Sequence, residues 1–364
     1  MQILYSLYKL RPVRNQILIV SRQSNQPSID IRLLEERLHQ TMPNYTVKVM
    51  CRYSKSAASL DVPYIRYVMG PLMKAFATSK VVVLDGYCIP ASMLKHRPQL
   101  KIIQMWHAMG CFKKFGFATV GEEGGYTPEF AKMMHMHENY DYVFTSSETC
   151  KKAFAEAFHV SEEKMKVMPL PRMDFIRDER YVKECRQRII ETYPQLDDGK
   201  AVILYAPTFR KDADNEGFIR DFAKACDLEK YHLVVKPHPI IKGITLGQGI
   251  ICDYKFQSIE MLSVCDYVVS DYSAFVLEAA LANKPIFRYV PDEEEYLQRR
   301  GFFTDIRTQW PGCREADADA LMQAIEQDRF DLSEVKTFAQ KYVQTNVQAT
   351  KQIASFIQEL TVGS

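Results

Sequence analysis

Nine short runs rich in β-branched residues recur along this chain, separated by stretches long enough for helices. In chain order the runs are QILIVS (16–21), YTVKVM (45–50), KVVVLDG (80–86), LKIIQMW (100–106), YDYVFTSS (140–147), AVILYAPTF (201–209), YHLVVKPH (231–238), YVVSDYS (267–273) and KPIFRYV (284–290). Continuous apolar strands joined by helix-length connections are typical of parallel sheets that helices cover on both faces. The pattern therefore predicts an α/β fold built from two Rossmann-like halves.

Two prolines mark the expected division between the halves. Pro169 and Pro171 interrupt regular structure within VMPLPRMDF (167–175), shortly before a new helical stretch begins. A chain of 364 residues is also too long for one typical core of about 100–200 residues. We therefore predict one domain over 1–172 and a second over 173–364.

The last part of the sequence has the pattern of one long helix. Asp331 and Glu334 have the spacing of a capping box, which marks a helix start. Apolar pairs four residues apart follow, and the first of them is Phe338 with Tyr342. The pattern predicts a single helix over about 333–360.

Composition and charge exclude several classes of protein. Apolar residues make up 47% of the chain and charged residues 25%, which is ordinary for a folded protein. The formal net charge of +2 gives no general attraction for nucleic acid. The nine cysteines form no C-x-x-C pair, and His135 and His137 lack a third ligand at zinc spacing. Neither a disulfide framework nor a structural zinc is expected, and a reducing cytoplasm fits this cysteine usage.

The first residues, MQILYSLYKLRPVR, do not have the pattern of a targeting or spanning segment. Their apolar stretch falls short of the roughly 20 residues of a spanning helix, and Lys9, Arg11 and Arg14 take the place of a cleavage site. A first helix packed on its own domain is the simplest interpretation. The basic and apolar character also suits an anionic membrane surface. The expected location is the cytoplasm, with peripheral contact to the inner face of the cell membrane as a further option.

Polar residues directly follow several of the predicted strands. His107 follows KIIQMW, Thr208, Arg210 and Lys211 follow AVILYA, and His238 follows HLVVK between two prolines. Ligands of open α/β sheets bind beyond these carboxyl ends. An arginine can hold phosphate oxygens in a bidentate way, and a histidine can exchange a proton near neutral pH. The alternatives are a core histidine at His107, a solvated loop histidine at His238 and a surface charge pair at Arg210.

The segment SDYSAFVLEAALANKP (270–285) has the pattern of a strand, a loop and a helix, with Ser273 as the N-cap. Free N–H groups at the helix start, together with the hydroxyls of Ser270, Tyr272 and Ser273, would hold a phosphate or diphosphate. Glu278 lies just over one turn further, where its carboxylate would accept the hydroxyls of a ribose. A plain helix cap at Ser273 is the alternative, and the neighbouring polar groups favour the binding site.

Seven segments carry a joint pattern: QMWHAMGCFKKFG (104–116), DYVFTSSE (141–148), LPRMD (170–174), LYAPTFR (204–210), VKPHP (235–239), SDYSAFVLEAALANKP (270–285) and RGFFTD (300–305). Together they resemble the CDP-glycerol glycerophosphotransferase family of bacterial teichoic acid and capsule synthesis. They occur in the family's order over most of the chain. The resemblance implies a GT-B architecture, in which two Rossmann-like domains face a central cleft. The C-terminal domain would bind the CDP-alditol donor, the N-terminal domain would approach the acceptor, and the final helix would cross back to the first domain.

The resemblance also assigns roles residue by residue. His107 falls on the histidine of the family's Trp-His motif, and His238 on that of its Lys-Pro-His-Pro motif; both are implied to be catalytic. The implied donor and phosphate site comprises Thr208, Arg210, Ser270, Asp271, Tyr272, Ser273 and Glu278. Candidates on the acceptor side are Trp106, Lys113 and Lys114. Many members carry aspartate at Glu278 and serine at Ala274, which puts the donor contacts and the choice of alditol in question.

The implied reaction is the transfer of an alditol phosphate. A hydroxyl of a lipid-linked teichoic acid or capsule-type acceptor attacks the β-phosphorus of CDP-glycerol or CDP-ribitol, a phosphodiester forms and CMP leaves. Such a displacement depends chiefly on positioning and charge stabilisation. His107 would accept the acceptor's proton and His238 would stabilise the diphosphate, although the residues leave an exchange of these two roles open. No carboxylate cluster demands a metal, and a divalent cation is neither required nor excluded.

Two other functions remain open at this point. A GT-B glycosyltransferase that uses a nucleotide sugar would share the fold, the phosphate site and the ribose carboxylate. Whether the protein consumes a nucleotide sugar or a CDP-alditol would distinguish it from an alditol-phosphate transferase. A catalytically silent subunit that binds a lipid-linked polymer is the other, and the retention of His107, His238 and Arg210 argues against it. Neither G-x-S-x-G nor G-x-G-x-x-G occurs, which removes the simplest hydrolase and dehydrogenase interpretations.

Overall fold

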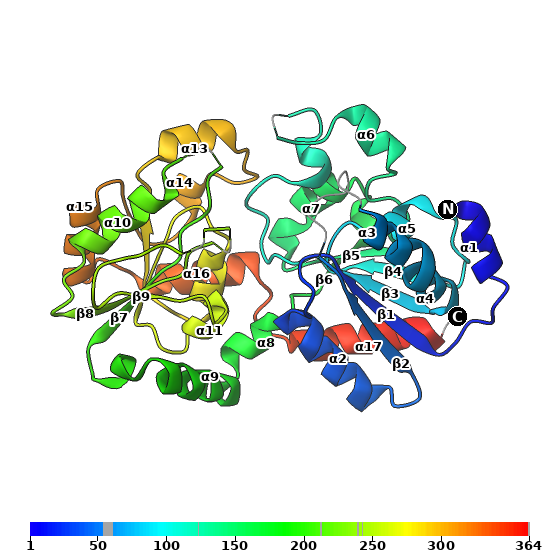
Figure 1. Cartoon of the computed structure of the whole chain (residues 1–364), viewed down its shortest axis with the longest axis horizontal. Helices are drawn as coiled ribbons and strands as arrows, with labels where there is room; N and C mark the ends of the chain where they lie inside the picture. Colours follow the sequence, from blue (N-terminus) through cyan, green and yellow to red (C-terminus); the bar gives the residue numbers. More distant parts are fainter. Residues whose placement is uncertain (54–60, 123, 212, 239, 242, 363–364) are drawn as a thin grey trace. The chain divides into compact units, whose positions relative to one another are not determined.

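The computed structural model describes residues 1–53, 61–122, 124–211, 213–238, 240–241 and 243–362. The chain folds into two compact units (Figure 1). Unit 1 comprises Met1–Asp174 and Asn346–Ser364, and unit 2 comprises Phe175–Thr345. Each unit contains a parallel sheet of six strands between helices, which confirms the predicted α/β class and its two Rossmann-like halves.

The sheet of unit 1 has the strand order β2–β1–β3–β4–β5–β6. Its strands are β1 (Gln16–Ser21), β2 (Thr46–Cys51), β3 (Val81–Leu84), β4 (Lys101–Gln104), β5 (Tyr142–Thr145) and β6 (Met165–Val167). Every residue of β1 and β3 is buried, as expected for strands that helices cover on both faces. The first five strands confirm the predicted runs, whereas β6 has only three residues and was not predicted.

Among the helices of unit 1, three begin at side chains that cap them. The helices are α1 (Gln2–Tyr8), α2 (Ile29–Thr41), α3 (Val62–Tyr67), α4 (Met73–Thr78), α5 (Ile89–Met93), α6 (Pro128–Met133), α7 (Lys151–Phe158) and α17 (Ala349–Val362). The hydroxyl of Ser28 accepts the backbone N–H of Ile31 at the start of α2, and Asp61 and Thr127 cap α3 and α6 in the same way. These caps satisfy N–H groups that a helix start leaves without a partner.

The prediction of one helix over about 333–360 is wrong. The structure has two helices, α16 (Leu332–Tyr342) in unit 2 and α17 in unit 1. The intervening sequence VQTNVQ (343–348) is rich in β-branched residues, which lowers helix propensity, and Val343 already has an extended backbone. The two oxygens of Asp174 accept the backbone N–H groups of Ala349 and Thr350, so α17 has its own start. It then packs along α2 (Figure 1).

The sheet of unit 2 has the strand order β12–β11–β10–β7–β8–β9. Its strands are β7 (Ala201–Tyr205), β8 (Tyr231–Val235), β9 (Ile251–Cys252), β10 (Tyr267–Ser270), β11 (Ile286–Tyr289) and β12 (Cys313–Glu315). Its helices are α9 (Glu179–Thr192), α10 (Asn215–Ala225), α11 (Ser258–Met261), α12 (Phe275–Leu281), α13 (Glu293–Arg299), α14 (Ile306–Gln309), α15 (Ala318–Glu326) and α16, while α8 (Arg172–Arg177) spans the boundary between the units. Four strands confirm the predicted runs, and the short edge strands β9 and β12 were not predicted.

Three general features of the chain bear on its function. No helix among the described residues is long and apolar enough to cross a membrane. All nine cysteines are free thiols. Across the described ranges, no group of three or more histidine, cysteine, aspartate and glutamate side chains is placed so that it can hold a metal ion.

Candidate active site

The strand orders identify where each sheet can bind a ligand. Successive strands of unit 1 are added on opposite sides of β1, so the order reverses between β1 and β3. In unit 2 the order reverses between β7 and β10. A ligand of an open α/β sheet binds beyond the carboxyl ends of the strands at such a reversal, because the flanking loops diverge there. The residues after β1 and β3, and those after β7 and β10, are therefore the candidate ligand-binding positions.

The imidazole of His107 lies at the reversal point of unit 1. Its Nδ1 is 2.7 Å from the backbone oxygen of Asp85, which directly follows β3. The side-chain Nε2 of Gln23, just after β1, is 3.2 Å from the same nitrogen, but an amide nitrogen only donates, so it makes no hydrogen bond to a protonated Nδ1. A carbonyl oxygen can only accept, so Nδ1 carries the proton in the neutral ring and Nε2 carries the lone pair. This tautomer presents Nε2 as a proton acceptor.

His107 is neutral at physiological pH. Burial lowers its pKa to about 4, and the nearby Arg172 cation acts in the same direction, although the hydrogen bond to Asp85 opposes them. The unperturbed histidine value is about 6.5. The imidazole can therefore accept a proton across the neutral range, as a general base must.

A buried ion pair holds the backbone of His107. The backbone N and the side-chain Nε and Nη2 of Arg172 donate to the carboxylate of Asp30, at 2.8, 2.8 and 2.5 Å. Nη2 also donates to the backbone oxygen of His107 at 3.1 Å. Asp30 lies in the first turn of α2 and is only 2% exposed. The pair joins segments 142 residues apart and ties both to the His107 loop.

Trp106 has a left-handed backbone, with φ of 66°. This conformation is costly for a bulky residue and persists only when its surroundings enforce it. The indole stacks on Phe115 with ring centroids 4.7 Å apart, and its centroid lies 4.1 Å from that of the His107 ring, which is tilted by 37°. Trp106 thus forms one wall beside the imidazole. Lys113 and Lys114 are partly exposed on the same loop, where they remain acceptor-side candidates.

Arg210 is enclosed by carboxylates at the reversal point of unit 2. Its Nε and Nη2 contact the two oxygens of Asp292 at 2.6 and 3.0 Å, and its Nη1 lies 3.0 Å from Asp271. The Thr208 hydroxyl donates to Asp271 at 2.6 Å. Burial opposes the charge of Arg210, but the two carboxylates outweigh it and raise the pKa of the guanidinium. With its side chain 6% exposed, Arg210 is placed to fix the loops after β7 and β10.

The SDYS loop turns most of its side chains inward. Ser270 and Asp271 are fully buried, and the Ser270 hydroxyl donates to the backbone oxygen of Ala206 at 2.8 Å. The Tyr272 hydroxyl donates to Asp292 at 3.0 Å, in the same network as Arg210. Among the four residues of the loop, Ser273 is the partly exposed one. The structure therefore gives Ser270, Asp271 and Tyr272 a supporting place behind the loop.

Ser273 was predicted to be the N-cap of the helix, but it lies one residue before the N-cap. The N-cap residue of α12 is Ala274. The Ser273 hydroxyl still accepts the backbone N–H of Phe275 at 3.3 Å, so it stabilises the helix start without being its N-cap. Glu278 lies on α12 and is 7% exposed, and its predicted contact with a ribose stays a prediction.

The ring of His238 is exposed on the loop that follows β8. Its Nδ1 accepts the backbone N–H of Ile240 at 3.3 Å, and its ring centroid is 5.5 Å from that of Phe209. Because Nδ1 accepts, the proton of the neutral ring lies on Nε2. His238 and His107 are thus held in opposite tautomers. Pro239, which was expected to restrict this loop, lies outside the described residues.

Lys236, two residues before His238, anchors the same loop from inside. Its ammonium donates to the carboxylate of Asp253 at 2.8 Å and to the backbone oxygen of the same residue at 3.0 Å. Asp253 is fully buried and also accepts the hydroxyl of Tyr193 at 2.7 Å. The paired charges compensate each other, which a buried position requires.

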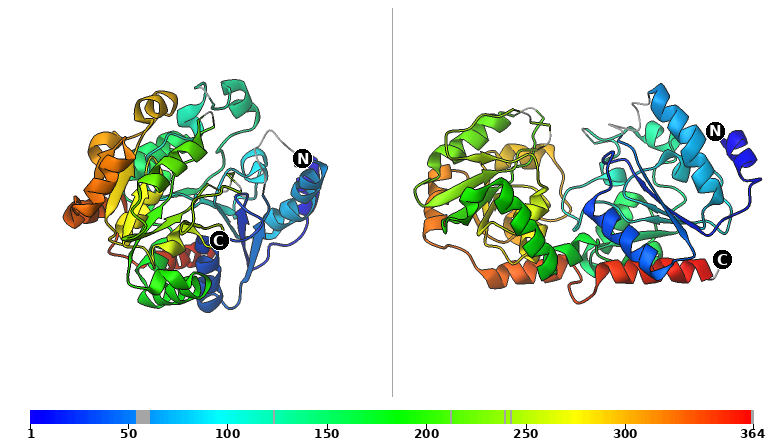
Figure 2. Two further views of the ribbon diagram at one scale, coloured as in Figure 1. Left: turned by 60° about the vertical axis from the view of Figure 1, so that its left-hand side comes forward. Right: turned by 60° about the horizontal axis from the view of Figure 1, so that its bottom comes forward.

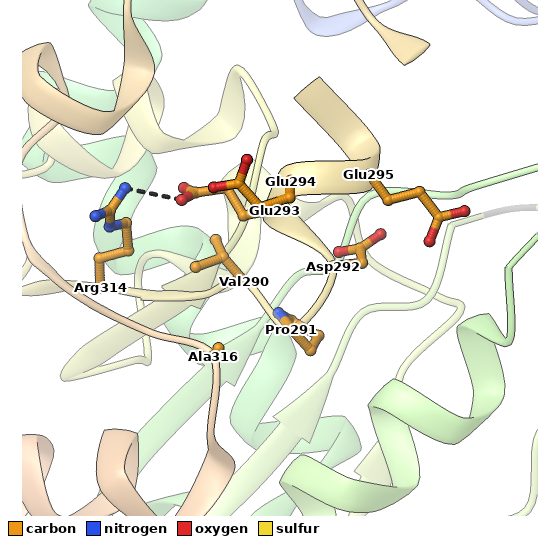
Figure 3. A pocket seen from close by; sticks show the side chains of 8 residues that line it. All are labelled: Val290, Pro291, Asp292, Glu293, Glu294, Glu295, Arg314 and Ala316. Atoms are coloured by element: carbon orange, nitrogen blue, oxygen red, sulfur yellow. Dashed lines mark hydrogen bonds and ion pairs between the residues drawn. The ribbon is translucent and has the colours of Figure 1, made fainter. Parts of the chain in front are cut away.

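An acidic pocket opens beside α13 in unit 2 (Figure 3). Its volume is about 480 Å³, and four consecutive carboxylates, Asp292 to Glu295, line it. Arg314 is the cation in its lining, and its Nη1 pairs with Glu293 at 2.8 Å. The excess of negative charge opposes a diphosphate, so this pocket is a poor site for a nucleotide donor.

Several residues of the site were missed by the reading of the sequence. Asp30, Asp85 and Asp292 act through contacts with residues far along the chain, and no local pattern marks them. Arg172 and Gln104 lie inside two segments that carry the family resemblance, LPRMD and QMWHAMGCFKKFG, but neither residue was predicted to belong to the site. A polar residue at the end of a buried apolar strand, as Gln104 is, would have been the available signal.

A family model and curated relatives from teichoic acid synthesis match this chain over nearly its whole length. A family model described as CDP-glycerol:poly(glycerophosphate) glycerophosphotransferase matches residues 3–359. The teichoic acid ribitol-phosphate primase of Bacillus spizizenii is 28% identical, over 98% of this chain and 95% of that protein. The teichoic acid glycerol-phosphate primase of Bacillus subtilis is also 28% identical, with the same coverage of 98% and 95%. The chain spans about half the length of the curated ribitol-phosphate polymerases that it matches.

A solved structure supports the architecture. The wall teichoic acid polymerase TagF aligns with a TM-score of 0.77 over 99% of this chain and 93% of that chain, at 20% identity. A structure of that polymerase with CDPG aligns with a TM-score of 0.78. The likeness is consistent with a GT-B-like architecture of two Rossmann-like domains.

Proposed function

The chain belongs to the CDP-glycerol:poly(glycerophosphate) glycerophosphotransferase family, and we propose that it transfers an alditol phosphate from a CDP-alditol to an acceptor hydroxyl. The transferred group is glycerol phosphate or ribitol phosphate, and the acceptor is a lipid-linked teichoic acid or capsule-type polymer. The acceptor oxygen attacks the β-phosphorus, the bond from that phosphorus to the bridging oxygen breaks, and CMP leaves. The proton of the attacking hydroxyl goes to a base on the protein.

The observation that carries the mechanism is the 2.7 Å contact between the His107 ring and the backbone oxygen of Asp85. The Nδ1–H of the ring donates to this oxygen, so Nε2 is the acceptor for the proton of the attacking hydroxyl. At His238, Nδ1 is already an acceptor, and the Nε2–H is a donor suited to a phosphate oxygen. The two tautomers favour His107 as the base and His238 as the group that stabilises the diphosphate.

The donor side of the proposal rests on unit 2. Ser273 and His238 are at least partly exposed near the ends of β10 and β8, and the Ser273 hydroxyl and the His238 Nε2–H supply donors for phosphate oxygens. Arg210 and Asp271 act indirectly, because their ion pair and the bond from Thr208 to Asp271 fix the shape of these loops. On the acceptor side, Trp106, Lys113 and Lys114 lie on the His107 loop of unit 1.

The proposed reaction is tested by measuring CMP release. The purified chain is incubated with CDP-glycerol or CDP-ribitol and a lipid-linked acceptor, with and without a divalent cation. We expect release from one of the two donors that depends on the acceptor. Turnover of a nucleotide sugar, with no release from either CDP-alditol, would instead favour the glycosyltransferase alternative.

We expect Ser273→Ala to weaken CDP binding. A hydrogen bond to a charged group contributes about 1.5–3 kcal/mol, which corresponds to a rise of roughly tenfold or more in Kd. Titration calorimetry with CDP measures the change. Ser263→Ala is the matched control, because the Ser263 hydroxyl caps a backbone oxygen elsewhere in unit 2. Equal CDP affinity in the wild type and both variants would remove Ser273 from the donor site.

We further propose that the enzyme works in the cytoplasm, with α1 against the inner face of the membrane where a lipid-linked acceptor is presented. Figure 2 shows α1 at the outer edge of unit 1. Its buried anchor is Tyr5, while Ile3, Leu7 and Leu10 are 82%, 58% and 82% exposed. Arg11 follows directly and is exposed. Exposed apolar side chains beside basic ones are the combination that binds anionic lipid surfaces.

A triple variant, Ile3→Gln with Leu7→Gln and Leu10→Gln, tests this surface without changing the charge. We expect binding to anionic phosphatidylglycerol vesicles to weaken by more than about tenfold, since burial of each such side chain contributes about 1.5–3 kcal/mol. Vesicle sedimentation measures the bound fraction. Ile240→Gln is the control, because Ile240 is 62% exposed in unit 2. If the triple variant sediments like the control, α1 has only a packing role.

A further inference from the structure

Gln104 is a fully buried glutamine whose amide makes three hydrogen bonds, two from its N–H groups and one to its oxygen. It is the last residue of β4. Its Nε2 donates to the backbone oxygen of Gly86 at 3.1 Å and to the Tyr140 hydroxyl at 3.1 Å. Its Oε1 accepts the backbone N–H of Trp106 at 3.0 Å. The orientation of the amide is therefore fixed, because a backbone oxygen only accepts and a backbone N–H only donates.

Gln104 joins the backbones of Gly86 and Trp106, and each is next in the chain to one partner of the hydrogen bond between His107 and Asp85. Gly86 directly follows Asp85, whose backbone oxygen accepts the Nδ1–H of His107. Trp106 directly precedes His107 in the chain. One side chain therefore connects the segment that carries the imidazole to the segment that carries the acceptor for its Nδ1–H. The distance between these two segments decides whether the 2.7 Å hydrogen bond can form.

The contact with Trp106 also explains how an unfavourable backbone is kept. A left-handed conformation is energetically costly at a bulky residue such as Trp106, whose φ is 66°. The N–H of Trp106 lies 3.3 Å from the backbone oxygen of Leu84, at the long limit of a hydrogen bond, and 3.0 Å from Gln104 Oε1. Without the amide of Gln104, this N–H would lose its shorter partner, and the turn that aims His107 would be less well determined.

A second layer supports the amide from behind. The Tyr140 hydroxyl accepts from Gln104 and lies 3.0 Å from Nδ1 of the buried His137. Burial lowers the pKa of His137 to about 3, so its ring is neutral and Nδ1 can accept the Tyr140 proton. The chain of bonds from His137 through Tyr140 to Gln104 is therefore consistent in its donors and acceptors.

We infer that Gln104 is a positioning residue for the transfer reaction, which holds His107 in the tautomer and orientation of a base by bridging the Gly86 and Trp106 backbones. The inference rests on the proposed role of His107 as the base. Gln104 acts through the backbone, because its hydrogen bonds join Gly86 and Trp106 on either side of the imidazole's hydrogen bond. Its effect is expected on the rate of the chemical step and not on the binding of the donor, which is assigned to the other unit.

A purely structural role for a buried glutamine is the alternative, and the chain offers a matched control. Gln16 is 7% exposed and begins β1, at the opposite end of the same sheet. Its Nε2 donates to the Ser79 hydroxyl at 2.7 Å and to the backbone oxygen of Ala75 at 3.4 Å. Gln16→Met and Gln104→Met remove the same amide from the same sheet, but only the second lies beside His107.

Both variants are measured for thermal midpoint, kcat and KM in the CMP-release assay. We expect both substitutions to lower the thermal midpoint. We expect Gln104→Met alone to lower kcat by roughly 10–100-fold, the scale of a misplacement of about 1 Å, with KM for the donor within about threefold of the wild type. If Gln104→Met does not fold, Gln104→Asn replaces it, because a shorter amide cannot bridge both backbone groups, and the same fall is expected.

The state of the His107 ring provides a readout that does not depend on activity. Ring nitrogens are observed by NMR in protein labelled with ¹⁵N-histidine, and His107 is assigned from His107→Ala. We expect Nδ1–H in the wild type and in Gln16→Met, and a mixture of tautomers in Gln104→Met. A wild-type tautomer together with wild-type kcat in Gln104→Met would overturn the inference. Absence of CMP release from the wild type, or full activity of His107→Ala, would instead contradict the proposed function.

Discussion

Replacing His107 by alanine is expected to lower kcat by about 10²–10⁴-fold, the usual contribution of a positioned general base. Affinity for CDP should stay within about twofold, because the donor site is assigned to unit 2. The physical reason is the ring state set by Asp85, which leaves Nε2 as the proton acceptor. Steady-state CMP release gives kcat, and calorimetry with CDP gives the affinity.

The control for this change is His39→Ala, which removes an exposed histidine from α2 of the same unit. It should leave both quantities unchanged. The pH profile adds an independent check. Since burial lowers the pKa of His107 to about 4, the base stays unprotonated from neutral pH down to about pH 5. An ordinary histidine near 6.5 would already lose activity in that range. A folded His107→Ala enzyme with near wild-type kcat, when chemistry limits the rate, would exclude His107 as the base.

Replacing Arg210 by methionine should have the largest effect on stability. The change leaves Asp271 and Asp292 buried without their cation, and breaking a buried pair in this way costs about 3–5 kcal/mol. The loops after β7 and β10 should lose their order, so CDP binding should be lost as well. Urea unfolding followed by fluorescence measures the free energy, and calorimetry measures CDP binding.

The matched control for that change is an exposed pair of the same type. Arg186 and Asp197 pair at 2.7 Å in unit 2, with side chains 46% and 57% exposed. Arg186→Met should change the free energy of unfolding by no more than about 1 kcal/mol, because solvent screens an exposed pair. Arg210→Lys tests geometry separately, since an ammonium cannot make the bidentate contact with Asp292. If Arg210→Met binds CDP normally at wild-type stability, the network is not what shapes the loop.

The sequence by itself determined the fold class and the placement of both histidines. A continuous apolar run such as QILIVS needs burial on both faces, which a parallel sheet between helices provides. The number and spacing of these runs therefore predict two sheets. The residue after such a run must lie at a carboxyl end, which is why His107 and His238 were identified. Local patterns were insufficient for β6, β9 and β12, because two or three residues show no periodicity. The break between α16 and α17 was missed because amphipathic spacing continues on both sides of it.

The tertiary structure alone decided what each polar group of the site can do. In the sequence, Arg210 is the residue type that binds phosphate, but the folded chain places two carboxylates around its guanidinium. Asp30 and Arg172 meet across 142 residues, a separation that no local pattern spans. The tautomer of His107 depends on the backbone oxygen of Asp85, which follows β3. Gln104 can join the two loops only because β3 and β4 end side by side. Hydrogen bonds are directional and short, so these roles follow from distances between segments and not from residue types.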